Sequence, residues 1–280
     1  MSTLVKRTLS ALIFSAIMVS GILFHPVAYA AVMLLCIGIM TLEFYRMSLA
    51  GWNRTGQIFG FFSSVFLFVT TYIVAGYGLV TARFFLLFMP LPVTAAWITI
   101  LYSKSEEVIK SAAFLFLPIL YIAVPFSMCN FLVFPSVGSY RGINLLALFI
   151  LLWASDIGGY LIGMGFGQKK GHKLFPRVSP KKSWEGFVGC VLFAQLAAVV
   201  LYRWNPLFLP WAHYAILALI ITVFGVLGDL IESVMKRSFG VKDTGAIMPG
   251  HGGLLDRFDA ALIALPIAII YILFVNLTGL

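Results

Sequence analysis

Residues 212–259 read AHYAILALIITVFGVLGDLIESVMKRSFGVKDTGAIMPGHGGLLDRFD, an apolar run that passes abruptly into the most charged stretch of the chain. A second apolar run follows and continues to residue 278. Each run is long enough to cross the hydrocarbon core of a bilayer as a helix, which takes about 20 apolar residues. The sequence therefore predicts two membrane-spanning helices joined by a charged segment. Ionisable groups at membrane depth are costly, so these charges predict a functional site.

The composition extends this interpretation to the whole chain. Of its 280 residues, 61% are hydrophobic and 10% are charged, and the mean hydropathy is +1.03. A soluble domain is about one quarter charged. We therefore predict an all-α polytopic integral membrane protein with about nine transmembrane helices and a polar cavity in its C-terminal half. The first span resembles a signal peptide without a small-residue cleavage site, and we interpret it as a retained anchor. The predicted spans lie near residues 9–24, 27–48, 56–80, 84–102, 112–133, 144–166, 184–204, 212–237 and 254–278.

Basic residues are distributed unevenly between the two faces of this predicted path. All but three of the 19 Lys and Arg residues fall on the side of the N-terminus, the exceptions being Arg83, Arg141 and Arg203. The positive-inside rule therefore places the N-terminus and the charged loops in the cytoplasm and the C-terminus outside. This distribution explains the net charge of +9, and we expect no nucleic-acid partner.

The eighth predicted span carries one polar stripe near its cytoplasmic end, because its polar residues recur at helical spacing. Asp229 lies about 12 Å below the end of the stripe at 1.5 Å per residue, too deep for its short side chain to reach water alone. It needs a cation, a hydrogen-bond donor or a polar cavity. The alternative is a buried ion pair with Lys or Arg from a neighbouring segment. The stripe consists of Asp229, Glu232, Ser233, Lys236 and Arg237.

The ninth predicted span begins with two acids, Asp256 and Asp259, which share a helix face at a spacing of three. Together with Asp229 on the preceding span, they could hold one or two divalent cations. Hard carboxylate oxygens suit Mg²⁺, which also takes phosphate oxygens as ligands. The absence of a Cys/His cluster argues against zinc.

A glycine-rich turn, Pro249 to Gly253, joins these two spans. Gly252 and Gly253 let backbone N–H groups approach a ligand, and the following helix N-terminus favours an anion. Alone, the turn could be a simple tight turn, but the charges beside it make it a candidate phosphate site. His251 is either a substrate contact or a plain loop histidine.

A second basic loop holds Lys169, Lys170, Lys173, Arg177, Lys181 and Lys182. It could set topology or bind anionic lipid headgroups, or it could clamp a triphosphate. Ser183 is placed to cap the helix that follows. Upstream, Asp156 lies within the sixth predicted span and is followed by two glycines and Tyr160. An acid at this depth again indicates function.

The motifs in this half resemble the phosphatidate cytidylyltransferase family, also called CDP-diacylglycerol synthases. The family signature is close to S-x-x-K-R-x4-K-D, then a small residue, then P-x-H-G-G-x-x-D-R-x-D. The segments around Asp156 to Tyr160 and Ser179 to Gly186 also resemble the family, whereas the first half of the chain matches only as apolar spans. The signature is matched without departure at Ser233, Lys236, Arg237, Lys242, Asp243, Gly245, Pro249, His251, Gly252, Gly253, Asp256, Arg257 and Asp259.

The resemblance implies transfer of a cytidylyl group from CTP to phosphatidic acid, giving CDP-diacylglycerol and pyrophosphate for phospholipid biosynthesis. It also implies Mg²⁺, a monovalent cation such as K⁺, and a homodimer with nine spans per subunit. We expect a multi-pass protein of a bacterial-type cytoplasmic (inner) membrane with a cytoplasmic active site. Residues 1–143 would form scaffold or interface and residues 144–280 the catalytic region of a single membrane domain.

Resemblance and residue chemistry together predict the site. The expected metal ligands or their close supports are Asp229, Asp256 and Asp259. Catalytic roles are expected for these three acids and for Lys236, Arg237 and Lys242. Substrate contacts are expected at Asp156, Tyr160, Lys181, Lys182, Ser233, Asp243, His251, Gly252, Gly253 and Arg257.

Two other functions remain compatible with the charge pattern. A CTP-dependent lipid kinase would use the same metal and nucleotide but would attack the γ-phosphorus. An ion-coupled transporter would also carry intramembrane acids, but transporters often repeat broken helices in both halves. Here the acids of interest gather in one half and on one predicted face, which favours an enzyme.

Overall fold

The computed structural model of the chain describes residues 3–102, 107–167, 171–247 and 252–279, with side chains from residue 10 onward. His251, Pro249 and Gly250 of the predicted turn lie outside the described residues. The same holds for Lys104, Lys169 and Lys170 and for the side chains of Lys6 and Arg7. The chain forms two units, Met1–Gly142 with Asp243–Arg257, and Ile143–Lys242 with Phe258–Leu280.

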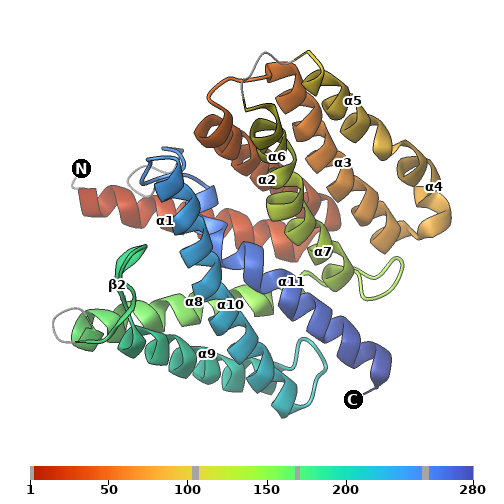
Figure 1. Cartoon of the computed structure of the whole chain (residues 1–280). Helices are drawn as coiled ribbons and strands as arrows, with labels where there is room; N and C mark the ends of the chain where they lie inside the picture. Colours follow the sequence, from red (N-terminus) through yellow and green to blue (C-terminus); the bar gives the residue numbers. More distant parts are fainter. Residues whose placement is uncertain (1–2, 103–106, 168–170, 248–251, 280) are drawn as a thin grey trace. The chain divides into compact units, whose positions relative to one another are not determined.

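The helices of the first unit follow one another along the chain with short connections (Figure 1). Proline divides two of its apolar stretches, because it has no N–H to donate to the helix ladder. Pro90 begins a new helix, and a π-helical turn, η1, separates Pro118 from Pro125. The elements are α1 (Thr3–Phe24), α2 (Pro26–Leu49), α3 (Arg54–Tyr77), α4 (Leu79–Phe88), α5 (Pro90–Ile100), α6 (Val108–Pro118), η1 (Ile119–Ala123) and α7 (Val124–Val133).

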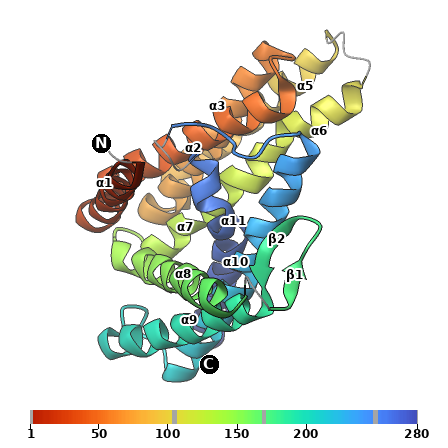
Figure 2. The ribbon, with the colours of Figure 1, turned by 90° about the vertical axis from the view of Figure 1, so that its left-hand side faces the viewer.

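The second unit contains long helices and one small hairpin. The strands β1 and β2 pair antiparallel, with Lys173 opposite Ser183, and the hairpin leads into α9 (Figure 2). This hairpin was not predicted, because a short polar loop shows no strand periodicity. The elements are α8 (Gly142–Ile162), η2 (Gly163–Gly167), β1 (Lys173–Phe175), β2 (Ser179–Ser183), α9 (Trp184–Trp204), α10 (Trp211–Ser238) and α11 (Leu255–Thr278).

The predicted apolar spans are confirmed as helices. Within the described residues, eight stretches are long and apolar enough to cross a membrane, and the described apolar part of α1, Ser10–Phe24, is shorter. Each of the nine predicted spans therefore corresponds to a helical stretch. The eight long ones are Pro26–Leu49, Arg54–Tyr77, Leu79–Ile100, Val108–Val133, Gly142–Gly167, Trp184–Trp204, Trp211–Ser238 and Leu255–Thr278.

Two close helix approaches shape the second unit. A Cβ at Gly189 of α9 would lie 2.5 Å from the carbonyl oxygen of Gly158 on α8, so these helices pack backbone to backbone. A Cβ at Gly228 of α10 would lie 2.6 Å from the carbonyl oxygen of Asp259 on α11. Small residues are what allow membrane helices to approach this closely. The second contact brings Asp229 and Glu232 of α10 close to Asp259 of α11.

Candidate functional site

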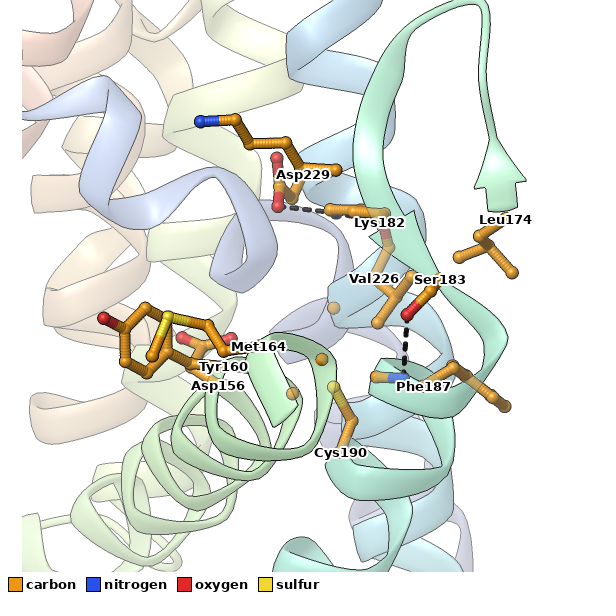
Figure 3. Close-up of a pocket in the computed structure, with 15 residues that line it drawn as sticks. Asp156, Tyr160, Met164, Leu174, Lys182, Ser183, Phe187, Cys190, Val226 and Asp229 are labelled. Atoms are coloured by element: carbon orange, nitrogen blue, oxygen red, sulfur yellow. Dashed lines mark hydrogen bonds and ion pairs between the residues drawn. The ribbon is translucent and has the colours of Figure 1, made fainter. Parts of the chain in front are cut away.

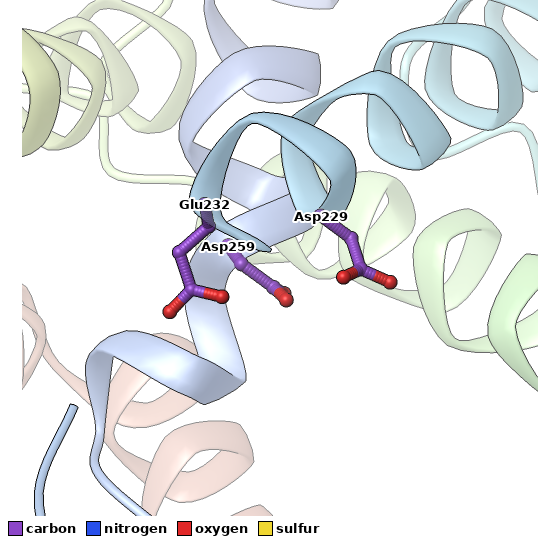
Figure 4. Close-up of side chains that lie close together, drawn as sticks. All are labelled: Asp229, Glu232 and Asp259. Atoms are coloured by element: carbon purple, nitrogen blue, oxygen red, sulfur yellow. The ribbon is translucent and has the colours of Figure 1, made fainter. Parts of the chain in front are cut away.

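Three carboxylates meet where α10 lies against α11. Asp229 and Glu232 of α10 and Asp259 of α11 each offer an oxygen, and these oxygens lie within 4.8 Å of one another (Figure 4). The side chain of Glu232 is completely buried and that of Asp229 is 37% exposed. Carboxylates this close repel one another unless cations are near.

Two lysines pair with this carboxylate cluster. Lys182 of β2 places its Nζ 2.5 Å from Oδ2 of Asp229, and Lys236 places its Nζ 2.6 Å from Oε2 of Glu232. Ser233 also donates to Oδ1 of Asp229 at 3.4 Å. The ion pair considered as the alternative for Asp229 is therefore present. It does not stand alone, because Asp229 also belongs to the cluster.

The donor set fits a hard divalent cation. All three groups are carboxylates on two adjoining helices, and oxygen ligands of this kind suit Mg²⁺. The cluster differs from the predicted ligand set in one member, because it contains Glu232 and not Asp256. Sequence reasoning placed Glu232 on the polar stripe but assigned it no role in binding metal.

A cavity of about 610 Å³ adjoins Asp229 (Figure 3). Its polar lining includes four residues predicted to contact substrate, and its apolar lining includes Met164, Leu174, Phe187 and Val226. The C-terminal half thus contains a cavity with both charged and apolar groups in its lining. The four predicted residues are Asp156, Tyr160, Lys181 and Lys182.

Local structure explains how the lysines reach this cavity. Ser183 caps α9 by accepting a hydrogen bond from the Gly186 N–H at 3.2 Å, as predicted. Lys181 and Lys182 directly precede the cap on β2, so the start of α9 fixes their place at the cavity. Lys181 is exposed, whereas the Lys182 side chain is 22% exposed and crosses to Asp229 (Figure 3).

The basic end of α10 divides into a buried and an exposed part. Lys236 is buried beside Glu232. Arg237 and Lys242 are exposed, and Nη1 of Arg237 donates to the Val241 carbonyl at 2.9 Å. Asp243 and Arg257, in the first unit, are exposed as well. These exposed groups can meet a ligand without leaving a core.

Asp256 organises the turn before α11. Its Oδ2 accepts hydrogen bonds from the Gly253 N–H at 2.7 Å, the Thr244 N–H at 3.0 Å and the Thr244 hydroxyl at 3.1 Å. Gly252, next to this turn, has a φ of +87°, which favours glycine. Asp256 therefore ties the two sides of the turn together.

Sequence reasoning missed Glu43, a buried acid of α2. Its carboxylate accepts hydrogen bonds from the Leu254 N–H at 3.0 Å and the Leu255 N–H at 2.8 Å. At the start of α11, where the sequence predicted a phosphate site, the N–H groups of Gly253, Leu254 and Leu255 thus donate to protein carboxylates. A lone acid inside an apolar run was the available signal, because such a residue is functional by default.

These features define a class, that of polytopic helical membrane proteins with a carboxylate cluster between two long apolar helices, beside a cavity that carries lysines. A sequence model of the cytidylyltransferase family matches residues 5–275, and the chain belongs to this family of enzymes.

Named relatives show the same similarity over part of the chain. The chain is 37% identical over 165 residues to the phosphatidate cytidylyltransferase of Staphylococcus epidermidis, covering 59% of this chain and 60% of that protein. It is 39% identical over 168 residues to the protein of that name in Staphylococcus aureus, with the same coverage. It is 42% identical over 117 residues, 42% of each chain, to that of Bacillus subtilis. The chain thus spans less than two thirds of the length of the relatives it matches.

Proposed function

We propose that the chain is a phosphatidate cytidylyltransferase, which converts CTP and phosphatidic acid into CDP-diacylglycerol and pyrophosphate. Family membership and the names of the relatives support this proposal. The observation that carries it is the carboxylate cluster of Asp229, Glu232 and Asp259 beside a cavity that presents Lys181 and Lys182. Such a site can bring two polyanions together inside a membrane protein.

The proposed reaction is an in-line displacement at phosphorus. An oxygen of the lipid phosphate forms a bond to the α-phosphorus of CTP, and the bond from that phosphorus to the bridging oxygen of the β-phosphate breaks. The electron pair leaves with pyrophosphate. The lipid phosphate is already ionised near neutral pH, so no general base is needed. Positioning and charge stabilisation are then the main tasks of the protein.

Each charged group has a task in this scheme. The carboxylate cluster would hold Mg²⁺, which supplies electrostatic stabilisation of the phosphate oxygens when bound. Lys181 and Lys182 would neutralise the triphosphate at the cavity. Arg237, Lys242 and Arg257 are exposed, and an arginine can bind phosphate through two N–H groups.

The cavity also suits a lipid substrate. Its wall combines charged groups with apolar side chains such as Met164 and Phe187. The acyl chains would therefore stay in the bilayer while the phosphate enters from the side. Exposed Tyr160 lines the same cavity and would lie near the headgroup.

The remaining parts of the proposal rest on sequence alone. The distribution of Lys and Arg supports a cytoplasmic active site in a bacterial-type inner membrane. The family resemblance supports a homodimer, a monovalent cation beside Mg²⁺, and a catalytic role for residues 144–280 with residues 1–143 as scaffold.

Pyrophosphate release by the purified protein tests the proposal. The assay contains CTP, phosphatidic acid and Mg²⁺, with parallel samples that hold a chelator or replace phosphatidic acid by diacylglycerol. We expect metal-dependent pyrophosphate release with an equal amount of CDP-lipid. Cytidine diphosphate formed with diacylglycerol would establish the lipid kinase instead. No turnover of any lipid by folded protein would favour the transporter.

A further inference from the structure

Glu43 is a buried acid on a helix that otherwise looks like scaffold. It is the one acidic residue of α2 and is 1% exposed. Burying a carboxylate is costly unless hydrogen bonds or cations compensate it. The hydrogen bonds that Glu43 accepts supply this compensation.

The carboxylate of Glu43 lies at the N-terminus of α11. Oε1 accepts from the Leu254 N–H at 3.0 Å, and Oε2 accepts from the Leu255 N–H at 2.8 Å and the Thr244 hydroxyl at 3.5 Å. The first N–H groups of a helix have no partner within the helix, and the helix dipole favours an anion there. Glu43 supplies that anion from α2.

The segment from Thr244 to Leu254, which we call the signature turn, approaches this carboxylate closely at both of its described ends. A Cβ at Gly245 would lie 2.5 Å from Oε1 of Glu43, and a Cβ at Gly253 would lie 2.7 Å from Oε2. The Thr244 hydroxyl lies between the two acids, 3.1 Å from Oδ2 of Asp256 and 3.5 Å from Oε2 of Glu43, and its single proton can be donated to either. Both described sides of the signature turn therefore contact Glu43, directly or through Thr244.

We infer that Glu43 is a positioning residue for cytidylyl transfer, an inference that rests on the proposed function. It occupies the anion-binding end of α11 and holds the signature turn in place, so the amides of Leu254 and Leu255 do not bind substrate phosphate. Phosphate recognition then falls to side chains such as Arg257 and Lys242.

A conservative substitution tests the positioning role. Glu43→Gln keeps the size of the side chain but removes its charge and turns one acceptor into a donor that faces backbone N–H groups. We expect kcat to fall about 100-fold, the effect of a small misplacement of catalytic groups. The KM for CTP should rise by a smaller factor than kcat falls, because the side chains that bind phosphate are still present. Wild-type kcat in Glu43→Gln would overturn the inference.

The matched control is Glu107→Gln, which removes the same charge from an exposed acid paired with Lys110. It should change neither kcat nor KM. Glu43→Ala adds a second test, because it leaves a space beside two unpaired amides. Formate should restore part of its activity, whereas chloride at equal ionic strength should not. Equal effects of both salts would argue against a carboxylate seat.

Hydrogen exchange of the wild-type protein tests the inference without any variant that must fold. The amides of Leu254 and Leu255 should exchange slowly before substrate is added, and CTP with Mg²⁺ should leave their rates unchanged. Fast exchange that CTP suppresses would show a phosphate seat and overturn the inference. This readout needs no turnover, so its failure is distinct from a failure of the proposed activity, which the pyrophosphate assay decides.

Discussion

At the scale of single residues, substitution of Asp259 is the strictest test of whether the carboxylate cluster binds a metal ion. Asp259→Asn keeps the shape of the side chain but removes a charge from α11. We expect turnover to fall by about 10²- to 10³-fold, as for loss of one electrostatic contact in an active site. Mg²⁺ at about one hundred times its dissociation constant should stabilise the wild type by about 2.7 kcal/mol. Thermal unfolding in detergent should show this shift for the wild type and lose it in Asp259→Asn. An unchanged shift would remove Asp259 from the metal site.

The sequence predicted that Asp256 is a metal ligand or a close support of one, and the structure favours the supporting role. The structure gives one of its oxygens three hydrogen bonds within the turn, and the carboxylate cluster contains Glu232 in its place. We expect Asp256→Asn to lower turnover about 10- to 100-fold, the usual cost of disturbing a supporting contact, while Mg²⁺ still raises the unfolding temperature. Glu232→Gln should lose the Mg²⁺ shift. The opposite pattern would return Asp256 to the ligand set.

At the scale of elements, the approach of α10 to α11 is what assembles the cluster. A Cβ at Gly228 would meet the backbone of Asp259 and Ala260, which cannot move aside as a flexible side chain can. Gly228→Ala should therefore destabilise the protein by about 1–3 kcal/mol, the range for overpacking, and also reduce turnover. Gly165→Ala is the control, since a Cβ there meets nothing within 4 Å. Equal unfolding temperatures for the two variants would contradict this packing.

The cap of α9 acts at the same scale. The Ser183 hydroxyl accepts from the Gly186 N–H and ends the strand that carries Lys181 and Lys182. Ser183→Ala should cost about 1 kcal/mol of helix stability and should raise the KM for CTP more than it lowers kcat, because the lysines lose their fixed place. Steady-state kinetics against CTP concentration would measure this split. Ser183→Thr, which keeps the hydroxyl, should retain most of the wild-type affinity, and an equal loss in both variants would argue against the cap.

At the scale of the whole molecule, the predicted orientation can be measured by labelling single cysteines. Arg177 lies in the hairpin between β1 and β2, and Val137 is 65% exposed in the loop between α7 and α8. The native Cys36, Cys129 and Cys190 are all buried, which lowers the background. An impermeant maleimide added to intact spheroplasts should label Val137→Cys and not Arg177→Cys. Inverted vesicles should give the reverse result, and labelling of both from one side would contradict the predicted topology.

The sequence by itself determined the long apolar helices and several local features of the candidate site. Each span could be found because a bilayer demands about 20 apolar residues in a row, a requirement that any one helix meets alone. The polar stripe of α10, the cap at Ser183 and the signature motif are likewise local patterns. They follow from the helical repeat or from hydrogen bonds between near neighbours.

Only the tertiary structure decided which of these groups meet. Helical periodicity shows that Asp229 and Glu232 share a face, but it does not show that a glycine contact at Gly228 brings Asp259 opposite them. Nor could it pair Glu43 with Leu255, which lies 212 residues away. These contacts depend on where a second segment lies, and one helix carries no information about the helix that packs against it.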